Sequence, residues 1–438
     1  MPEESYSRSI LFAKYQNAEL AKEAISLARA FADVKFLRTA KPGTTLPHDW
    51  SRYVAINNVL RHTLDGALLA YAFSPREDGT MRDWEEAGRL ASRVEAFVVP
   101  SAAVECQVIE HEVDGREPAY LIAVSPIVSE LMAVLMWALP TVLLHYEMLR
   151  HKPGEEHFRE LMSMYGPGSR ELEESDYIVG TRLVQRLDDC IDSYLRAWVT
   201  NGATEPWSII PTGDRVLAEE RVDASTTYAA CTGFLLSHEL HHIQGGHFLA
   251  ADPDAALAPF LSDLPEETRR EVEADCSAFT LLLNSLIVRE AGEDRRPRIP
   301  NFKNLKKANP FSRTSLLPGK RRRQSQAHAQ FLRACVHRAT EAMLSFYAVM
   351  DLLAAMAGQD GQTAQAARFA RVAERRGVVR SYVKWLLGRI EDDWGARVWH
   401  PEEAELWTGL DDHIEHLKQT IVPAWKSSGA TFARPDER

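Results

Sequence analysis

The sequence lacks the paired cysteines that a disulfide scaffold would need. It has five cysteines among 438 residues, and no two of them form a C-x-x-C pair. An odd number of scattered cysteines is typical of free thiols in a reducing compartment. We therefore expect a cytoplasmic protein. The cysteines are at positions 106, 190, 231, 276 and 335.

Long uncharged apolar runs are also scarce. The first residues, MPEESYSRSILFAKYQ, lack the basic start and long apolar stretch of a secretory signal. The one membrane candidate, 121–146, is interrupted by Glu130 and two prolines. Its longest uncharged apolar run, 131–144, is shorter than the roughly 20 residues of a spanning helix. We expect a buried core helix here and no membrane span.

Positive charge is in deficit as well, since the net charge is -11. This balance argues against general binding to nucleic acids or anionic membranes. One segment departs from it: residues 291–323 contain eleven Lys and Arg against two acids, which leaves about -20 for the rest of the chain. No aromatic residues interleave with these charges in a known nucleic-acid motif. We interpret the segment as a solvated basic loop and do not expect a nucleic-acid partner.

The chain divides by pattern into two regions, 1–205 and 206–438, at a stretch rich in turn formers, 201–214. The first is of mixed α and β pattern, with a hairpin signal around Asp114-Gly115. The second is helical, so we predict an α+β fold that is mostly helical. The predicted helices are 18–32, about 129–149, about 173–199, 225–244, 266–290, 325–357, 362–390 and 403–421.

One stretch of the second region, LLSHELHHIQGGHF (235–248), is dense in histidine. His238, Glu239 and His242 form the pattern H-E-x-x-H. On a helix, residues four apart lie on one face, so both imidazoles can reach one metal ion. The glutamate beside the first histidine can then act as a general base toward water at that ion. His241 falls on another, polar face of the helix.

The pattern needs a third ligand. Metzincins supply it as the last histidine of H-E-x-x-H-x-x-G-x-x-H. Gly245 fits that pattern, but the last position is Phe248, and His247 comes one residue early. The metzincin pattern therefore fails, and the third ligand has to come from elsewhere in the chain.

A better candidate lies in PEETRREVEADCSAFTLLLNSL, 265–286. Read as a helix, Glu271 and Asp275 fall on its apolar, core-facing stripe, whereas Glu273 falls on a polar face and is expected to be solvated. Carboxylates that face a core are costly unless something compensates them. A zinc ion with its histidines would do so, with Glu271 as third ligand and Asp275 holding the second ring nitrogen of a ligand histidine.

An alternative explanation needs no metal. The core-facing carboxylates, Asp275 in particular, could form a buried salt bridge with Arg269 or Arg270, one or two turns earlier on the same predicted helix. A salt bridge would give Asp275 a role in stability alone, and zinc affinity would not depend on it.

The two-part motif resembles that of the gluzincin metallopeptidases, H-E-x-x-H-x-x-x-G-H followed by E-x-x-A-D. These include the HtpX and CAAX-prenyl-protease type and the soluble Lit-type phage-exclusion peptidases. No pair of membrane-spanning helices flanks the motif, which favours the Lit-like branch. The resemblance covers about 40 residues and implies a zincin-type peptidase domain. The matching residues are His238, Glu239, His242, Gly246, His247, Glu271, Ala274 and Asp275.

By this resemblance His238, His242 and Glu271 bind zinc, Glu239 is the base, and Asp275 and His247 support the ligands. The family's later H-P-x-x-x-R element has no clear counterpart, because WHPEEAELW (399–407) lacks the arginine. The oxyanion donor therefore stays open. Its candidates are His241, His247, His328, His337, His400 and Tyr347.

We therefore predict a zinc-dependent endopeptidase that acts on an intracellular protein substrate. The region 1–205 would select the target or bind a regulatory partner, and the Lit-like resemblance suggests a regulated defence or stress response. The alternative is a non-catalytic regulatory protein with a structural or vestigial zinc site, whose basic loop contacts nucleic acid or an acidic partner. Glu239 favours catalysis, since a structural site has no use for it.

Overall fold

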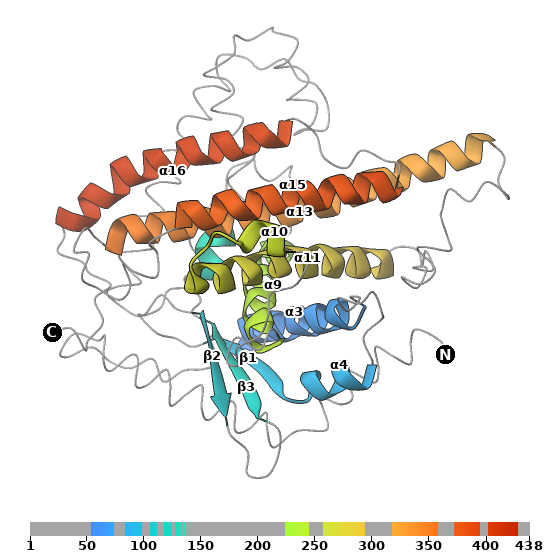
Figure 1. Ribbon diagram of the computed structural model, residues 1–438, viewed down its shortest axis with the longest axis horizontal. Coiled ribbons are helices and arrows are strands. Elements are labelled where there is room, and N and C mark those ends of the chain that lie inside the picture. Colours follow the sequence, from blue (N-terminus) through green and yellow to red (C-terminus); the bar gives the residue numbers. More distant parts are fainter. Residues whose placement is uncertain are drawn as a thin grey trace, which may run out of the picture.

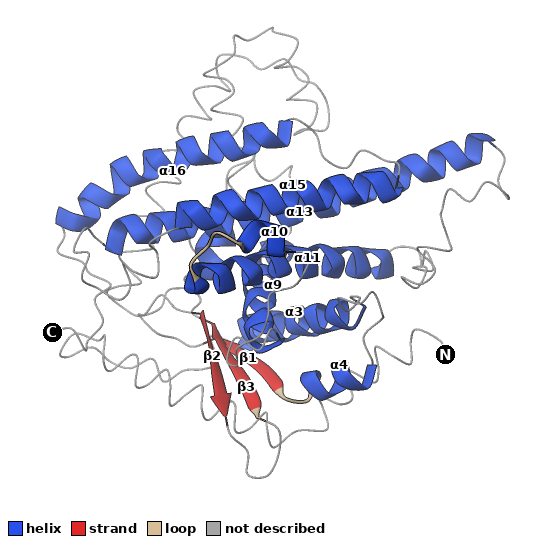
Figure 2. Cartoon of the chain, in the orientation of Figure 1, coloured by secondary structure: helices blue, strands red, loops and turns tan. Residues whose placement is uncertain are grey.

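The computed structural model describes 54–73, 84–98, 106–111, 118–124, 128–133, 135–136, 224–244, 257–293, 318–357, 372–394 and 402–427. Within these ranges the protein is mostly helical with one small sheet (Figure 2), as the sequence predicts. The helices predicted at 18–32 and 173–199, and the boundary between 205 and 206, lie outside the described residues.

The sheet has three strands in the order β1-β3-β2. β1 (Val94–Val98) pairs in parallel with β3 (Ala119–Val124), and β2 (Cys106–His111) pairs with β3 in antiparallel register, Cys106 opposite Val124. The predicted hairpin is therefore confirmed as β2 and β3; its turn lies outside the described residues. β3 is buried almost throughout, as expected for a central strand.

Among the described residues, two helices precede the sheet, α3 (Val54–Phe73) and α4 (Trp84–Ala91). Neither helix was predicted from the sequence pattern. The described residues 128–133 and 135–136 are helical and buried, which agrees with the helix predicted at about 129–149. The first residues of the apolar stretch 121–146 belong to β3, one of the two strands that the hairpin signal predicts. The rest of the predicted helix lies outside the described residues.

The helices after residue 206 match the predicted pattern closely. α9 (Ala224–Gln244), α11 (Glu266–Glu293), α15 (Val372–Trp394) and α16 (Glu402–Ser427) lie in the predicted segments. Residues 362–371 of the helix predicted at 362–390 lie outside the described residues, and a short α10 (Ala258–Leu261) was not predicted. The acidic first turn of α11 complements the helix dipole.

The basic segment 291–323 is not a loop at either end. Residues 291–293 close α11, and 318–323, with the run KRRR, form the first turns of α13 (Pro318–Ala357). Arg and Lys are good helix formers, so the helix predicted at 325–357 begins earlier, within the basic run. The middle of the segment, 294–317, lies outside the described residues.

The arrangement is layered around α11 (Figure 1). α13, α15 and α16 lie on one side of it, whereas α3 and the sheet lie on the other, and α9 crosses between them. One hydrophobic core runs through all these elements, so the described residues 54–136 share a core with the helices after 206. Residues Phe331–Met356 of α13 are long and apolar enough to cross a membrane, but 78% of this window is buried within the protein, as in a core helix.

α9 is buried along almost its whole length and fits closely between α3 and α11. A Cβ atom at Gly233 would lie 3.1 Å from Leu282 of α11 and 3.2 Å from Thr63 of α3. The absence of a side chain at Gly233 therefore lets the side chains of Leu282 and Thr63 pack directly against the backbone of α9.

Candidate metal centre

The C-terminal half of α9 presents two histidines on one face. His238 and His242 are four residues apart, and their Nε2 atoms lie 3.1 Å from each other. His238 lies in the buried part of the helix and is almost fully covered, whereas His242 lies near the end of the helix and is half-buried. Their rings meet edge to face. The predicted helical face is confirmed.

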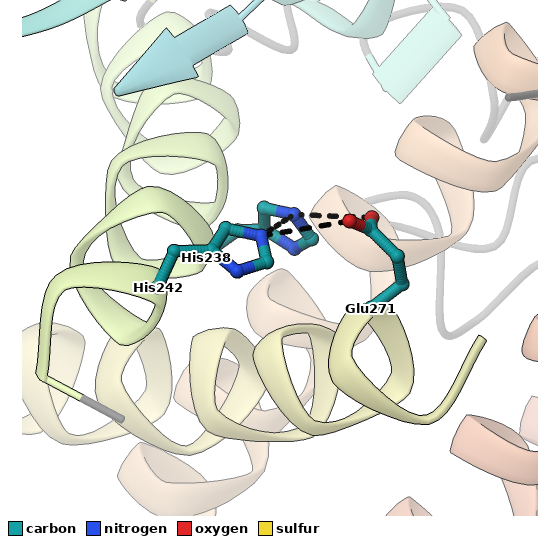
Figure 3. A group of neighbouring side chains, drawn as sticks. All are labelled: His238, His242 and Glu271. Atoms are coloured by element: carbon teal, nitrogen blue, oxygen red, sulfur yellow. Dashed lines mark hydrogen bonds and ion pairs between the residues drawn. The ribbon is translucent and has the colours of Figure 1, made fainter. Parts of the chain in front are cut away.

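Glu271, in the second turn of α11, faces these nitrogens (Figure 3). Its Oε2 lies 3.6 Å from His238 Nε2, and its Oε1 lies 3.7 Å from His242 Nε2. One ligand atom from each of the three residues falls within 4.8 Å of the others. Two imidazoles and one carboxylate are a donor set that zinc commonly takes.

Asp275, one turn after Glu271, holds the other side of the His238 ring. Nδ1 of His238 lies 3.0 Å from Oδ1 of Asp275, which is fully buried. A carboxylate accepts hydrogen bonds, so it keeps the proton on Nδ1 and leaves the Nε2 lone pair directed at the site. The predicted support of a ligand histidine by Asp275 is therefore present in the structure.

Two further side chains, Tyr347 of α13 and Arg375 of α15, bind the other oxygen of Asp275. The Tyr347 hydroxyl donates to Oδ2 at 2.5 Å, and Nε and Nη2 of Arg375 donate to it at 3.1 and 2.8 Å. Arg375 also reaches Glu271, with Nη1 3.1 Å from Oε2. A buried aspartate with this many donors is fully compensated.

The charges of this network set its protonation. Burial favours neutral carboxyl groups, but Arg375 and His238 outweigh it and hold the pKa values of Glu271 and Asp275 below their ordinary ranges. Burial alone would lower the pKa of His238, yet its hydrogen bonds with Asp275 and Glu271 raise that pKa to about 10. In the metal-free site His238 is therefore protonated on both ring nitrogens. A bound metal ion would displace the proton on Nε2.

The residues present fit a divalent metal ion. The two ring nitrogens 3.1 Å apart share a proton in the metal-free site, and a divalent ion bound by both would take the place of that proton. With neutral histidines, the carboxylates of Glu271 and Asp275 against the guanidinium of Arg375 leave one negative charge. A divalent cation such as Zn²⁺ would offset this charge, so donor type and the sign of the charge agree.

The sequence-based interpretation of burial along α11 is wrong for two residues. Glu273, expected to be solvated, is 5% exposed, whereas the side chain of Glu271, expected to face the core, is 41% exposed. The polar face of α11 is covered: Thr280, two turns after Glu273, contacts the hydroxyl of Tyr382 in α15 at 3.0 Å. A helix packed on several sides has no single core face.

The salt-bridge alternative named the wrong arginines. Arg270 pairs with Glu266 instead, and the partner of Asp275 is Arg375, 100 residues away. Asp275 thus contacts both a histidine and an arginine.

The candidates for the oxyanion donor divide into three groups, according to how far the structure describes them. Tyr347 is bound to Asp275 and buried, and His337 pairs with Glu341 on α13 at 3.1 Å, while His241 is half-buried at the end of α9. The side chain of His328 is not described. His247 and His400 lie outside the described residues.

Arg375 is the site residue that the sequence analysis missed. It lies in AERRGVVR (373–380), which contains one glutamate and three arginines, so composition does not distinguish it. Val372, Val379 and Val383, all buried, form an apolar stripe of α15. Arg375 and Arg376 both lie within one turn of this stripe, so spacing alone does not separate the buried arginine from its neighbour.

Comparisons with protein-family models, with curated proteins and with solved structures gave no significant match. The resemblance to gluzincins therefore depends on the motif residues alone.

Proposed function

We propose that this protein is a zinc-dependent endopeptidase of gluzincin type that hydrolyses peptide bonds of an intracellular protein. The observation that carries the proposal is the meeting of His238, His242 and Glu271 from two helices, with Asp275 behind His238. The motif spacing alone predicts this cluster, and the geometry is consistent with it. The cytoplasmic location and a zincin-type domain belong to the same proposal.

In this mechanism His238 and His242 bind the ion through Nε2, and Glu271 binds it through a carboxylate oxygen. When bound, zinc would lower the pKa of a water molecule to about 7 and polarise the scissile carbonyl. Glu239, next to His238 and buried, would accept the proton of the attacking water on a carboxylate oxygen and return it to the leaving amine. Asp275 holds the proton on His238 Nδ1 throughout.

The number of ligands favours catalysis over a structural site. Structural zinc sites have four protein ligands, whereas catalytic sites have three and one open position. Within the described ranges, three groups converge, and the half-exposed side chain of Glu271 keeps the cluster accessible from outside. By analogy with the Lit-like peptidases, we propose a regulated defence or stress response as the setting.

Substitution of Glu239 tests the catalytic proposal. Glu239→Gln should bind about one zinc per chain, as the wild type does, and should cleave nothing, because an amide does not accept the proton. The readouts are metal analysis and a proteome-wide comparison of cleaved proteins between cells with either form. Equal cleavage by both forms would show that the catalytic proposal is wrong.

The ligand set is tested by metal content. His238→Ala, His242→Ala and Glu271→Ala should each lose zinc, and Glu273→Ala, on the same helix, should keep it. Glu273 is a matched control because it is a glutamate two residues from Glu271 that lies on another face of α11. If Glu273→Ala lost zinc and Glu271→Ala kept it, the ligand would be Glu273 and not Glu271.

A further inference from the structure

Arg375 joins the two carboxylates of α11 through one guanidinium group. Its Nη1 lies 3.1 Å from Glu271 Oε2, while Nε and Nη2 bind Asp275 Oδ2 at 3.1 and 2.8 Å. The arginine is 5% exposed and Asp275 is fully buried, so the contact between these two is made out of water, where it is strong. The planar fork of an arginine suits this task, since its donors point in fixed, separate directions.

The contact with Glu271 selects one of its two oxygens. Oε2, bound by Arg375, is also the oxygen that lies 3.6 Å from His238, whereas Oε1 lies 3.7 Å from His242 Nε2. A carboxylate that accepts the N–H of an arginine on one oxygen has the other oxygen left for a metal ion. A carboxylate without that partner can turn and offer both.

We propose that Arg375 is a positioning residue that holds Glu271 by Oε2 and thereby makes it a ligand through Oε1 alone. This inference rests on the proposed zinc site. Its consequence for function is direct: with one oxygen from Glu271 and one nitrogen from each histidine, a tetrahedral ion keeps one position free. A second oxygen from Glu271 would fill that position.

The rest of the network fixes Arg375 in place. Asp275 holds the guanidinium and is itself held by His238 and Tyr347. The arginine is therefore oriented by a group that does not depend on Glu271, and its Nη1 is placed before any metal ion binds. Such support is typical of groups around metal ligands, whose loss costs roughly 10–100-fold in metal affinity or activity.

The test replaces Arg375 and follows the metal itself. Arg375→Met removes the fork, and Arg375→Lys keeps a positive charge but offers a single ammonium group that does not span both carboxylates. Arg376→Met is the matched control: it is the next residue of α15, and its Nη1 binds Asp411 Oδ1 of α16 at 2.7 Å, away from the metal centre. Each full-length protein is loaded with Zn²⁺ or Co²⁺.

Two readouts are independent of activity. Zinc affinity, measured by competition with a chelator, should fall roughly 10–100-fold in Arg375→Met and stay unchanged in Arg376→Met. The visible absorption of the Co²⁺ form should weaken in both Arg375 variants, because tetrahedral Co²⁺ absorbs strongly and additional ligands reduce the absorption. The lysine variant decides the outcome if the methionine variant does not fold.

Two results would overturn the inference. Metal binding by the wild-type protein distinguishes between them. If wild-type protein binds metal and Arg375→Lys has the same affinity and Co²⁺ spectrum, Arg375 is a counter-ion for folding only, and the zinc site still stands. If wild-type protein takes up neither Zn²⁺ nor Co²⁺, the proposed function fails and this inference fails with it.

Discussion

Two buried carboxyl groups beside α9 have opposite surroundings. Asp275, beside the second half of the helix, accepts hydrogen bonds from His238, Tyr347 and Arg375. Glu130, which is 2% exposed, has no hydrogen-bond partner for either oxygen in the described part of the chain. Its neighbour Ser129 reaches the first half of α9, where its hydroxyl donates to Tyr228 at 3.1 Å.

The two groups also differ in charge. Burial raises the pKa of Glu130 well above its ordinary value, and no cation offsets it. Burial acts on Asp275 in the same direction, but Arg375 and His238 outweigh it and lower the pKa. The surroundings therefore favour the anion at Asp275 and the neutral acid at Glu130. Burial alone does not make a functional carboxylate; the donors around it do.

The largest effect should come from removing the charge of Asp275. An amide in its place has to turn its NH₂ either toward His238, which reverses the ring tautomer, or toward the donors of Arg375 and Tyr347. Breaking a buried pair of this kind costs about 3–5 kcal/mol in unfolding free energy. We expect Asp275→Asn to lose this stability and to bind zinc roughly 10–100-fold more weakly, while still filling at saturating metal.

A zinc titration beside urea unfolding measures both effects. Asp351→Asn serves as the control. Asp351 of α13 pairs with Lys418 of α16 at 3.0 Å, and both side chains are half-buried. This pair does not include any residue of the metal centre. The control variant should change neither zinc affinity nor, by more than about 1 kcal/mol, stability. Unchanged zinc affinity in Asp275→Asn would remove Asp275 from the metal centre.

The second effect should come from Glu130 and depends on pH. Because its folded pKa is raised, the wild type has its full stability below the ordinary value of 4.5 and loses stability as pH rises toward the folded pKa. The loss amounts to about 1.4 kcal/mol per pH unit. Glu130→Gln does not ionise in either state, so it should be more stable than the wild type at pH 7 and should not show this slope.

Urea unfolding of both proteins from pH 4.5 to neutral pH measures the difference. Glu374→Gln, at an exposed position of α15, should follow the wild type. A constant difference between Glu130→Gln and wild type across this range would mean that Glu130 is ionised in the folded protein.

The comparison also shows what a sequence can predict. His238, His242, Glu271 and Asp275 were found because each pair lies one turn apart on a single helix, where spacing fixes the face. Their partners Tyr347 and Arg375 lie 72 and 100 residues from Asp275, on helices whose packing is not encoded in local spacing. Long-range contacts of this kind follow only from the assembled fold.

The degree of burial was less predictable than the direction of a side chain. The positions of Glu271 and Asp275 relative to each other were right, yet the burial of Glu271 and Glu273 was reversed, because α11 contacts α3, α9, α13 and α15. A periodic pattern gives the faces of a helix but not how many of them are covered. α3 was missed for a related reason, since polar His62 and Asp65 interrupt its apolar pattern.

The smallest effects should come from the two buried tyrosines, which form a matched pair. Tyr347 donates to the charged Asp275, whereas Tyr228 contacts the neutral Ser129. Loss of a hydrogen bond to a charged group costs about 1.5–3 kcal/mol, and loss of a neutral one about 0.5–1.5 kcal/mol. Tyr347→Phe should therefore lower the unfolding free energy more than Tyr228→Phe, and it alone should weaken zinc binding, because Asp275 then holds His238 less firmly. Urea unfolding and chelator competition on both variants give the two values. An equal loss of stability in both, with zinc affinity unchanged, would show that the Asp275 network is no stronger than an ordinary buried polar contact.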